Sequence, residues 1–158
     1  MKPIEFVGVR GGHGCTTVAI AAATFAGGLG LLKAHNLEDA QALTGTTILG
    51  PSEVFIMDSG IVPNSQWNTR RIAVLRGPDY LGAKTLLERR EQFDGMVMVQ
   101  EPGRSLMPSD MESMTGLQVV AVVDYTPSVA RTIDAGLFLQ KLPRLEEFAG
   151  LRSWIESL

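Results

Sequence analysis

The chain lacks several features that define large classes of protein. It has one cysteine, Cys15, so it forms neither an internal disulfide nor a zinc site built from several cysteines. It has no run of about 18 apolar residues, the length that a membrane-spanning helix needs, and its first residues read as a strand rather than as a secretion signal. Its formal net charge is only −3, so its overall field does not favour coating of nucleic acid. We therefore expect a cytoplasmic protein with no membrane span.

What the chain does contain is the composition of a globular domain. Of its 158 residues, 45% are hydrophobic and 20% are charged, which disfavours both disorder and a coiled coil. This length suits one domain with a sizeable buried core. Because neither a repeat nor a linker divides the sequence, we predict a single domain over residues 1–158.

Five short apolar runs, each bounded by glycine, proline or charge, are typical of strands buried on both faces of a parallel sheet. They are Ile4–Val9, Val54–Asp58, Ile72–Arg76, Met96–Gln100 and Val119–Asp124, and a weaker sixth candidate is Thr46–Leu49. The helices expected between them are Thr16–Ala26, Leu37–Leu43, Asp79–Phe93, one that begins at a capping box over Ser109–Glu112, one opened by Thr126 and Pro127, and a last one from about Arg144. The alternation predicts an α/β fold of three layers (α/β/α) around a doubly wound, mostly parallel sheet. Ligands of such sheets lie beyond the carboxyl ends of the strands.

A glycine-rich loop follows the first strand and opens the first helix. Gly11, Gly12 and Gly14 allow the backbone to curl, so that successive N–H groups converge on one point. The positive end of the helix dipole adds to this nest for an anion. Thr16 and Thr17 place hydroxyl groups where Mg²⁺ or a phosphate oxygen would lie. The loop predicts a phosphate-binding site, and the alternative is a tight turn with no ligand.

The segment from Arg10 to Thr17 resembles the deviant Walker A loop of the ParA/MinD ATPases, which reads Lys-Gly-Gly-x-Gly-Lys-Thr-Thr. Both departures fall on lysines, because Arg10 stands at the first and Cys15 at the second. The resemblance implies a shortened P-loop NTPase fold, a homodimer, and ATP or ADP with Mg²⁺ held by Gly11, Gly12, His13, Gly14, Cys15, Thr16 and Thr17. In the family the first lysine reaches phosphate across the dimer interface, which makes Arg10 the expected catalytic cation. The second lysine supplies a point charge that a neutral thiol lacks, and such a loss usually costs orders of magnitude in rate.

Two other parts of the chain bear on this resemblance. Asp58, which ends a predicted strand, is similar to the Asp of the family's Asp-x-Gly-Pro switch; the resemblance implies a catalytic role and, with Thr16, a share in holding Mg²⁺. The residues that fall where the family binds the nucleotide base are Gln100, Thr126 and Pro127. The segment Leu31–His35 departs from the family, because it lacks the acidic motif that usually ends the second strand. Like Cys15, this loss indicates a degenerate enzyme.

Other interpretations of the same residues stay open. A cysteine at a helix start beside His13 and Arg10 would have a lowered thiol pKa and could be reactive. Ala21 stands where a cysteine phosphatase would carry arginine, which argues against that enzyme class. The simpler interpretation is that Cys15 fills the space of the lysine and that His13 is an exposed loop residue.

Basic and amphipathic segments offer further alternatives. Two candidate basic patches for nucleic acid are Arg70, Arg71 and Arg76, and Lys84, Arg89 and Arg90 on one predicted helix. Interleaved glutamates make a solvated, salt-bridged face the simpler interpretation of the second patch. The last helix carries acidic residues that anionic lipid would repel, so we expect its apolar face to pack on the domain or on a protein partner.

The sequence therefore predicts a degenerate ParA/MinD-like protein. It would be a pseudo-ATPase with weak or no ATP hydrolysis, binding nucleotide weakly or not at all. It would act as a dimerising interaction or regulatory module in replicon partitioning or positioning. The alternatives are a slow but active Mg-ATPase that uses Arg10, and a structural module that binds DNA without sequence preference.

Overall fold

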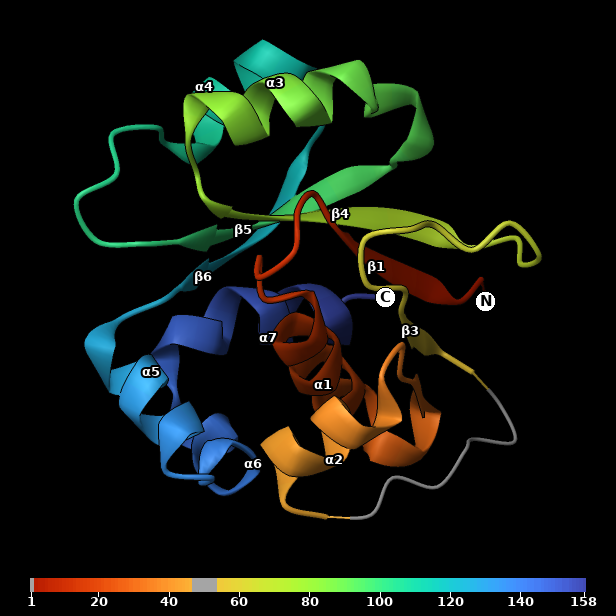
Figure 1. Ribbon diagram of the computed structural model, residues 1–158, viewed down its shortest axis with the longest axis vertical. Helices are drawn as coiled ribbons and strands as arrows, with labels where there is room; N and C mark the ends of the chain where they lie inside the picture. The colour runs from red at the N-terminus through yellow and green to blue at the C-terminus, as the bar shows by residue number, and fades with distance from the viewer. Residues whose placement is uncertain (1, 47–53) are drawn as a thin grey trace.

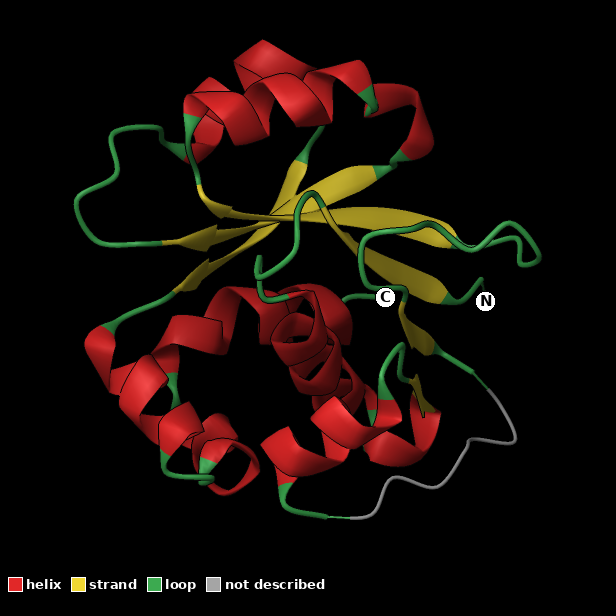
Figure 2. Cartoon of the chain, in the orientation of Figure 1, coloured by secondary structure: helices red, strands yellow, loops and turns green. Residues whose placement is uncertain are grey.

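A parallel β-sheet forms the centre of the protein. A computed structural model describes residues 2–46 and 54–158, and within them the sheet has six strands in the order β2-β3-β1-β4-β5-β6 (Figure 2). Every neighbouring pair is parallel. The strands are β1 (Ile4–Gly8), β2 (Leu32–Lys33), β3 (Ile56–Asp58), β4 (Arg70–Gly77), β5 (Gly95–Gln100) and β6 (Val119–Asp124). The sheet order reverses at β1, which confirms the predicted doubly wound α/β fold.

Helices cover both faces of the sheet (Figure 1). One face carries α1 (Cys15–Ala26), α2 (Leu37–Thr44), α5 (Pro127–Asp134), α6 (Phe138–Lys141) and α7 (Ala149–Glu156). The other face carries α3 (Tyr80–Glu88) and α4 (Pro108–Thr115). Within residues 2–46 and 54–158, none of these helices combines the length and the apolar content needed to cross a membrane.

Alternating side chains of the strands divide the core into two clusters. Phe6 and Val74 face the cluster under α1 and α7, whereas Val7 and Leu75 face the cluster under α3 and α4. Because successive side chains of a strand point to opposite faces, an uninterrupted apolar run fills both clusters at once. This explains why the strand runs in the sequence show no polar alternation.

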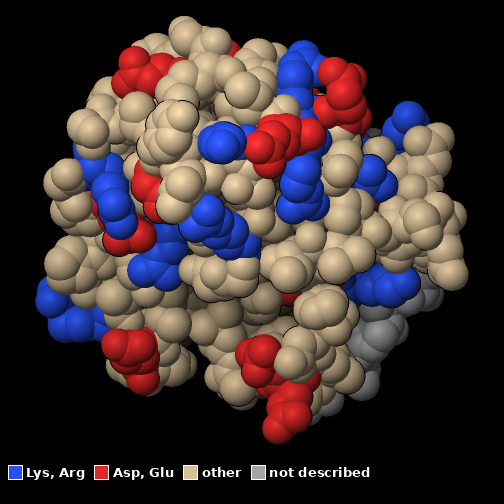
Figure 3. Space-filling view, turned by 45° about the horizontal axis from the view of Figure 1, so that its top comes forward, with Lys and Arg blue, Asp and Glu red and all other residues tan. Residues whose placement is uncertain are grey.

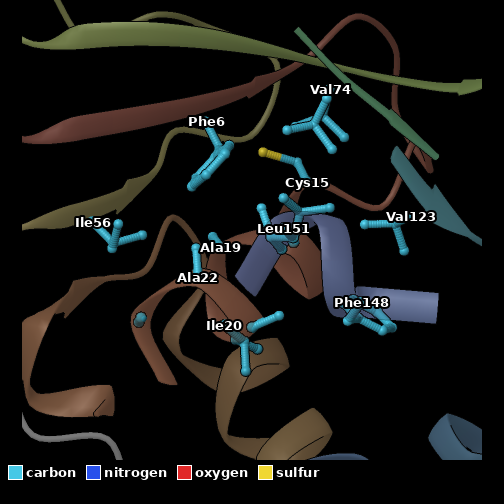
Figure 4. Close-up of a cluster of buried hydrophobic side chains, with 14 of the residues drawn as sticks. Phe6, Cys15, Ala19, Ile20, Ala22, Ile56, Val74, Val123, Phe148 and Leu151 are labelled. Carbon is cyan, nitrogen blue, oxygen red and sulfur yellow. The ribbon is translucent and has the colours of Figure 1, made fainter. Parts of the chain in front are cut away.

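Helix α1 packs closely on the sheet because its inner face is made of small side chains. Ala19, Ala21, Ala22 and Ala23 are fully buried. Figure 4 shows Ala19 and Ala22 in the same cluster as Phe6. Close packing of α1 fixes the position of its N-terminus, where the glycine-rich loop ends.

Several element boundaries differ from the sequence prediction. The strand β2 is a short edge strand inside the segment Leu31–His35, and the weak candidate Thr46–Leu49 falls almost wholly outside the described residues. Helix α3 ends at Glu88 rather than near Phe93, because the chain tightens into a 3₁₀ turn over Arg90–Gln92. The last helix does not begin at Arg144, because Leu145 is extended and separates two 3₁₀ turns before α7.

The capping box predicted over Ser109–Glu112 is in the wrong place, because the structure has Met107 at the N-cap and Asp110 at the third helical position. Helix α4 begins at Pro108, and the carboxylate of Asp110 accepts the N–H of Met107 at 2.8 Å. Glu112 instead accepts the N–H of Val119 at 2.8 Å and ties the helix to the start of β6. Proline occupies the first helical position, where its missing N–H costs nothing, and the helix starts two residues earlier than predicted.

Candidate functional site

The glycine-rich loop lies between β1 and α1 at the carboxyl edge of the sheet. Gly12 and Gly14 have φ values of 76° and 83°, which a residue with a side chain adopts only with strain. Gly14 is also the N-cap of α1, and neither a capping side chain nor an acidic residue occupies the first turn. The first N–H groups of α1 therefore have no side-chain acceptor and point to where an anion would lie.

The loop borders a hollow of about 450 Å³. Its lining residues are Arg10, Gly11, Gly12, His13, Gly14, Cys15, Thr16, Thr17, His35, Gly60 and Ile61. Every loop residue that the sequence predicted to contact nucleotide is thus brought to one place. Arg10 brings a positive charge to the lining, and His13 and His35 are its other basic side chains. The charge of Arg10 and the free helix end both favour an anion here, whereas the carboxylate of Asp58, which bonds Thr16, opposes one.

Asp58, at the end of β3, joins this strand to the glycine-rich loop. Its Oδ2 accepts the hydroxyl of Thr16 at 2.6 Å, and its Oδ1 accepts the N–H of Gly60 at 3.0 Å. The thiol of Cys15 also donates to Oδ1, at 3.3 Å. Thr16 and Asp58 therefore meet, as the resemblance implied for two residues that would share a metal ion.

The thiol of Cys15 is a buried group and not an exposed nucleophile. Figure 4 shows its sulfur directed into the buried cluster, towards Phe6, and the residue is 8% exposed. Burial raises the pKa of Cys15 well above its ordinary value, and the negative charge of Asp58 raises this pKa further. The alternative of a reactive thiolate is therefore wrong, because the thiol is buried and lies beside the carboxylate of Asp58.

Both histidines of the chain line the hollow. The resemblance placed His13 at the nucleotide, whereas His35 was not predicted at this site. His13 was expected to be exposed, but it is half-buried and its Nδ1 has no hydrogen-bond partner among the described residues. Burial lowers the pKa of His13, and the charge of Arg10 lowers this pKa further. His35 follows β2 and packs so closely on Gly60 that a Cβ there would lie 2.8 Å from its Cδ2. The sequence carried no signal for His35, because the short strand β2 before it leaves no apolar run.

Magnesium fits this site only in part. The hydroxyl of Thr16 and the carboxylate of Asp58 are hard oxygen ligands of the kind that Mg²⁺ prefers. No group of three or more metal-binding side chains occurs in the part of the chain that the structure describes. These two residues would hold Mg²⁺ only together with water and the phosphates of a ligand, whose negative charge the ion would neutralise.

The residues predicted to meet the nucleotide base lie at a second hollow, of about 520 Å³, beyond the ends of β5 and β6. Gln100 and Thr126 line it together with four acidic side chains, Glu101, Asp124, Glu146 and Glu147. The hydroxyl of Thr126 caps α5 by accepting the N–H of Val129 and donates to Glu147 at 3.1 Å. Pro127 begins α5. A base contact by Gln100, Thr126 or Pro127 stays a prediction.

The basic residues considered for nucleic acid do not gather in either of the expected patches. Arg70 and Arg71 begin β4 and Arg76 lies near its other end, about 20 Å away. Arg71 pairs with the buried Glu5 at 3.0 Å. Arg89 and Arg90 lie past the end of α3 and not on it. On the face drawn in Figure 3, basic and acidic side chains alternate.

Solved structures of ParA and MinD proteins share this fold, although no protein-family model and no curated protein sequence matches the chain. The MinC:MinD cell division complex of Aquifex aeolicus matches with a TM-score of 0.71 at 9% identity, over 99% of this chain and 95% of that chain. A ParA family ATPase of Chlorobium tepidum matches with a TM-score of 0.67 at 11% identity, over 98% and 97%. The septum site-determining protein MinD of Pyrococcus horikoshii, solved with Mg-ADP, matches with a TM-score of 0.65 at 12% identity, over 98% and 93%. The fold is therefore that of the ParA/MinD P-loop ATPases.

Proposed function

We propose that this chain is a degenerate ParA/MinD-like protein that binds ATP, ADP or a related polyphosphate weakly and hydrolyses it slowly or not at all. The observation that carries the proposal is the position of Cys15. Its thiol lies where the resemblance places the P-loop lysine, and it donates to Asp58 within the core. The backbone nest and the helix dipole are kept, so anion binding survives, while the main cation for a transferring phosphoryl group is absent.

Neither Cys15 nor its partner Asp58 supplies the positive charge that the P-loop lysine would provide. The raised pKa of Cys15 keeps the thiol protonated and neutral at physiological pH. Asp58 accepts three hydrogen bonds, from Cys15, Thr16 and Gly60. A carboxylate held in this way is a structural anchor, and it would have to give up the bond to Thr16 before both residues could turn to a metal ion.

The proposed role is that of a dimerising interaction or regulatory module in replicon partitioning or positioning. The neighbours in fold include a MinD solved in complex with MinC and a ParA family ATPase. Large apolar side chains are exposed at the same edge of the sheet as the loop: Ile61, Val62, Tyr80 and Leu81. A second copy of this chain or another protein would bury them.

The proposal is tested by measuring binding and turnover on one preparation. Calorimetry with ATP and with ADP, each with and without Mg²⁺, should give weak binding. Turnover with Mg-ATP at micromolar protein should fall far below that of ParA/MinD ATPases that carry the lysine. Sedimentation with and without ATP reports the dimer. A turnover rate comparable with those enzymes would refute the pseudo-ATPase, and a monomer under all conditions would refute the dimer.

The second candidate is a slow but active Mg-ATPase that uses Arg10. It is supported by the exposed position of Arg10 on the rim of the loop hollow. Replacement Arg10→Ala should then abolish a measurable turnover, and an unchanged rate would exclude this candidate. The DNA-binding alternative has less support, because Arg71 and Arg76 are engaged by Glu5 and Glu101. Lack of binding to random duplex at about 50 mM salt would remove it.

A further inference from the structure

A second arginine, Arg76, contacts the glycine-rich loop from β4, although it is not one of the residues that line the loop hollow. It lies near the end of β4, the neighbour of β1, and its Nη1 is 3.4 Å from the carbonyl oxygen of Gly12. Together with Gly14 and Thr17 it lines a small cavity of about 80 Å³ beneath the loop. The guanidinium therefore lies beside the loop, near the helix end that would bind an anion.

Two contacts besides the one with Gly12 hold Arg76 in this place. Its Nε donates to Oε1 of Glu101 at 3.0 Å, and its Cζ lies 4.1 Å from the centre of the Tyr125 ring. The side chain is 31% exposed. A guanidinium stacked on an aromatic ring and fixed by a carboxylate has already lost most of its conformational freedom. Binding of a ligand therefore costs it little further side-chain entropy.

Arg10 differs on each of these points. It is exposed, and no hydrogen bond or ion pair joins its side chain to another described residue. Ordering a free arginine on a ligand costs side-chain entropy that Arg76 has lost on folding. Of the two arginines near the loop, Arg76 is thus the better placed to act within one copy of the chain.

We propose that Arg76 is the residue that contacts the phosphates of the bound ligand in place of the lysine missing at Cys15. This inference rests on the proposed function, that the loop binds a polyphosphate anion. The guanidinium carries several N–H donors, and its long bond to the carbonyl of Gly12 is a weak one to give up. Exchange of this carbonyl for a phosphate oxygen forms a charge-assisted hydrogen bond.

Glu101 sets the strength of this contact. Its carboxylate neutralises Arg76 in the free protein and competes with the ligand for the same cation. Its other oxygen lies 3.9 Å from Arg104, an exposed residue that makes no hydrogen bond to the described residues of the glycine-rich loop. Arg104 shares the partner of Arg76 without sharing its place, which makes it a matched control.

The test measures binding of sodium tripolyphosphate and of ATP by calorimetry. Arg76→Gln should weaken both by at least about tenfold, because a charge-assisted bond to phosphate is lost. Arg10→Gln should cause a smaller loss, and Arg104→Gln should leave both affinities within about twofold. Thermal melting of each variant shows that it is folded.

A second variant separates binding from a structural role. Glu101→Gln removes the competing charge and should tighten tripolyphosphate binding by about threefold or more. If Arg76 acted only by holding the loop together with Glu101, this change would weaken binding or leave it unaltered. The inference is overturned if folded Arg76→Gln binds tripolyphosphate like the parent chain, if Arg10→Gln loses more than Arg76→Gln, or if Glu101→Gln binds tripolyphosphate more weakly than the parent chain or with the same affinity. Absence of any binding by the parent chain would overturn the proposed function as well, whereas the other outcomes leave it intact.

Discussion

The thiol of Cys15 and the carboxylate of Asp58, 43 positions apart in the sequence, are joined by a hydrogen bond of 3.3 Å. This contact ties the first turn of α1 to the end of β3, and so ties the glycine-rich loop to the neighbouring strand. It also shows how a cysteine is accommodated at the position where the resemblance has a lysine. The sulfur fills a buried position and finds an acceptor, so the loop keeps its shape without the cation.

Cys15 should resist thiol reagents in the folded protein. Its side chain is buried and its pKa is raised, so both access and thiolate content are low at pH 8. We expect its reaction with a disulfide reagent to be at least about a hundredfold slower in the native protein than in guanidinium chloride. Because this is the chain's one cysteine, the absorbance change reports on it alone. Equal rates in both conditions would contradict the buried position.

Glu5 should be a main determinant of stability. It is fully buried in β1, where its carboxylate accepts bonds from Ser59, Asn64, Thr69 and Arg71 at 2.6–3.0 Å. Replacement by Gln removes the charge from this set of donors and should cost about 3 kcal/mol in the free energy of unfolding, measured with urea. The matched control is Glu91→Gln, whose exposed pair with Arg90 should be worth less than about 1 kcal/mol. Equal costs for the two variants would contradict the role of Glu5.

The same carboxylate should make stability depend on pH. Burial by itself would raise the pKa of Glu5, but the hydrogen bonds from Asn64, Thr69, Ser59 and Arg71 outweigh it and hold this pKa below its ordinary value of 4.5. The unfolded chain therefore binds a proton first as the pH falls. The contribution of Glu5 is complete above pH 4.5 and is lost as the pH falls through the lower folded value. Urea unfolding from pH 7 to pH 3 should show this loss in the parent chain and a smaller one in Glu5→Gln.

Gly60 should not tolerate a side chain. Its φ of 62° is unfavourable for other residues, and an added Cβ would lie 2.8 Å from the ring of His35. Gly60→Ala should therefore cost about 1–2 kcal/mol. Gly30→Ala is the control, since it has open space and no positive φ, and it should be close to neutral. Equal melting temperatures for the two variants would show that His35 does not pack on Gly60.

The sequence predicted most of the sheet, because a strand buried on both faces must be apolar along its length. β1, β3, β4, β5 and β6 were each found within about two residues of their observed ends. β2 left no such run, since a two-residue edge strand needs neither length nor burial on both sides. The ends of helices were predicted less well, because the backbone conformation of one residue can set them. Pro108 begins α4, and the extended Leu145 interrupts the helical turns before α7.

Those parts of the candidate site that lie in one continuous segment could be predicted from the sequence. Contacts between residues far apart in the sequence could not. The loop from Arg10 to Thr17 is one continuous segment, so its glycines and hydroxyls could be read together. The partners of Glu5 are scattered over the chain and form a set only after β1 and β4 have paired. Arg76 was grouped with Arg70 and Arg71 by sequence distance, although an extended strand carries it to the opposite edge of the sheet.

The most direct test of the account is to restore the missing cation. Cys15→Lys should tighten ATP binding and raise Mg-ATP turnover by at least about tenfold, since it returns a point charge to a loop that has kept its amide groups. Cys15→Ser, which is similar in size and neutral, should leave both quantities near those of the parent chain. A folded Cys15→Lys protein with unchanged binding and turnover, or a parent chain that already turns over ATP as fast as this variant, would contradict the claim that the loop is an intact nest without its cation.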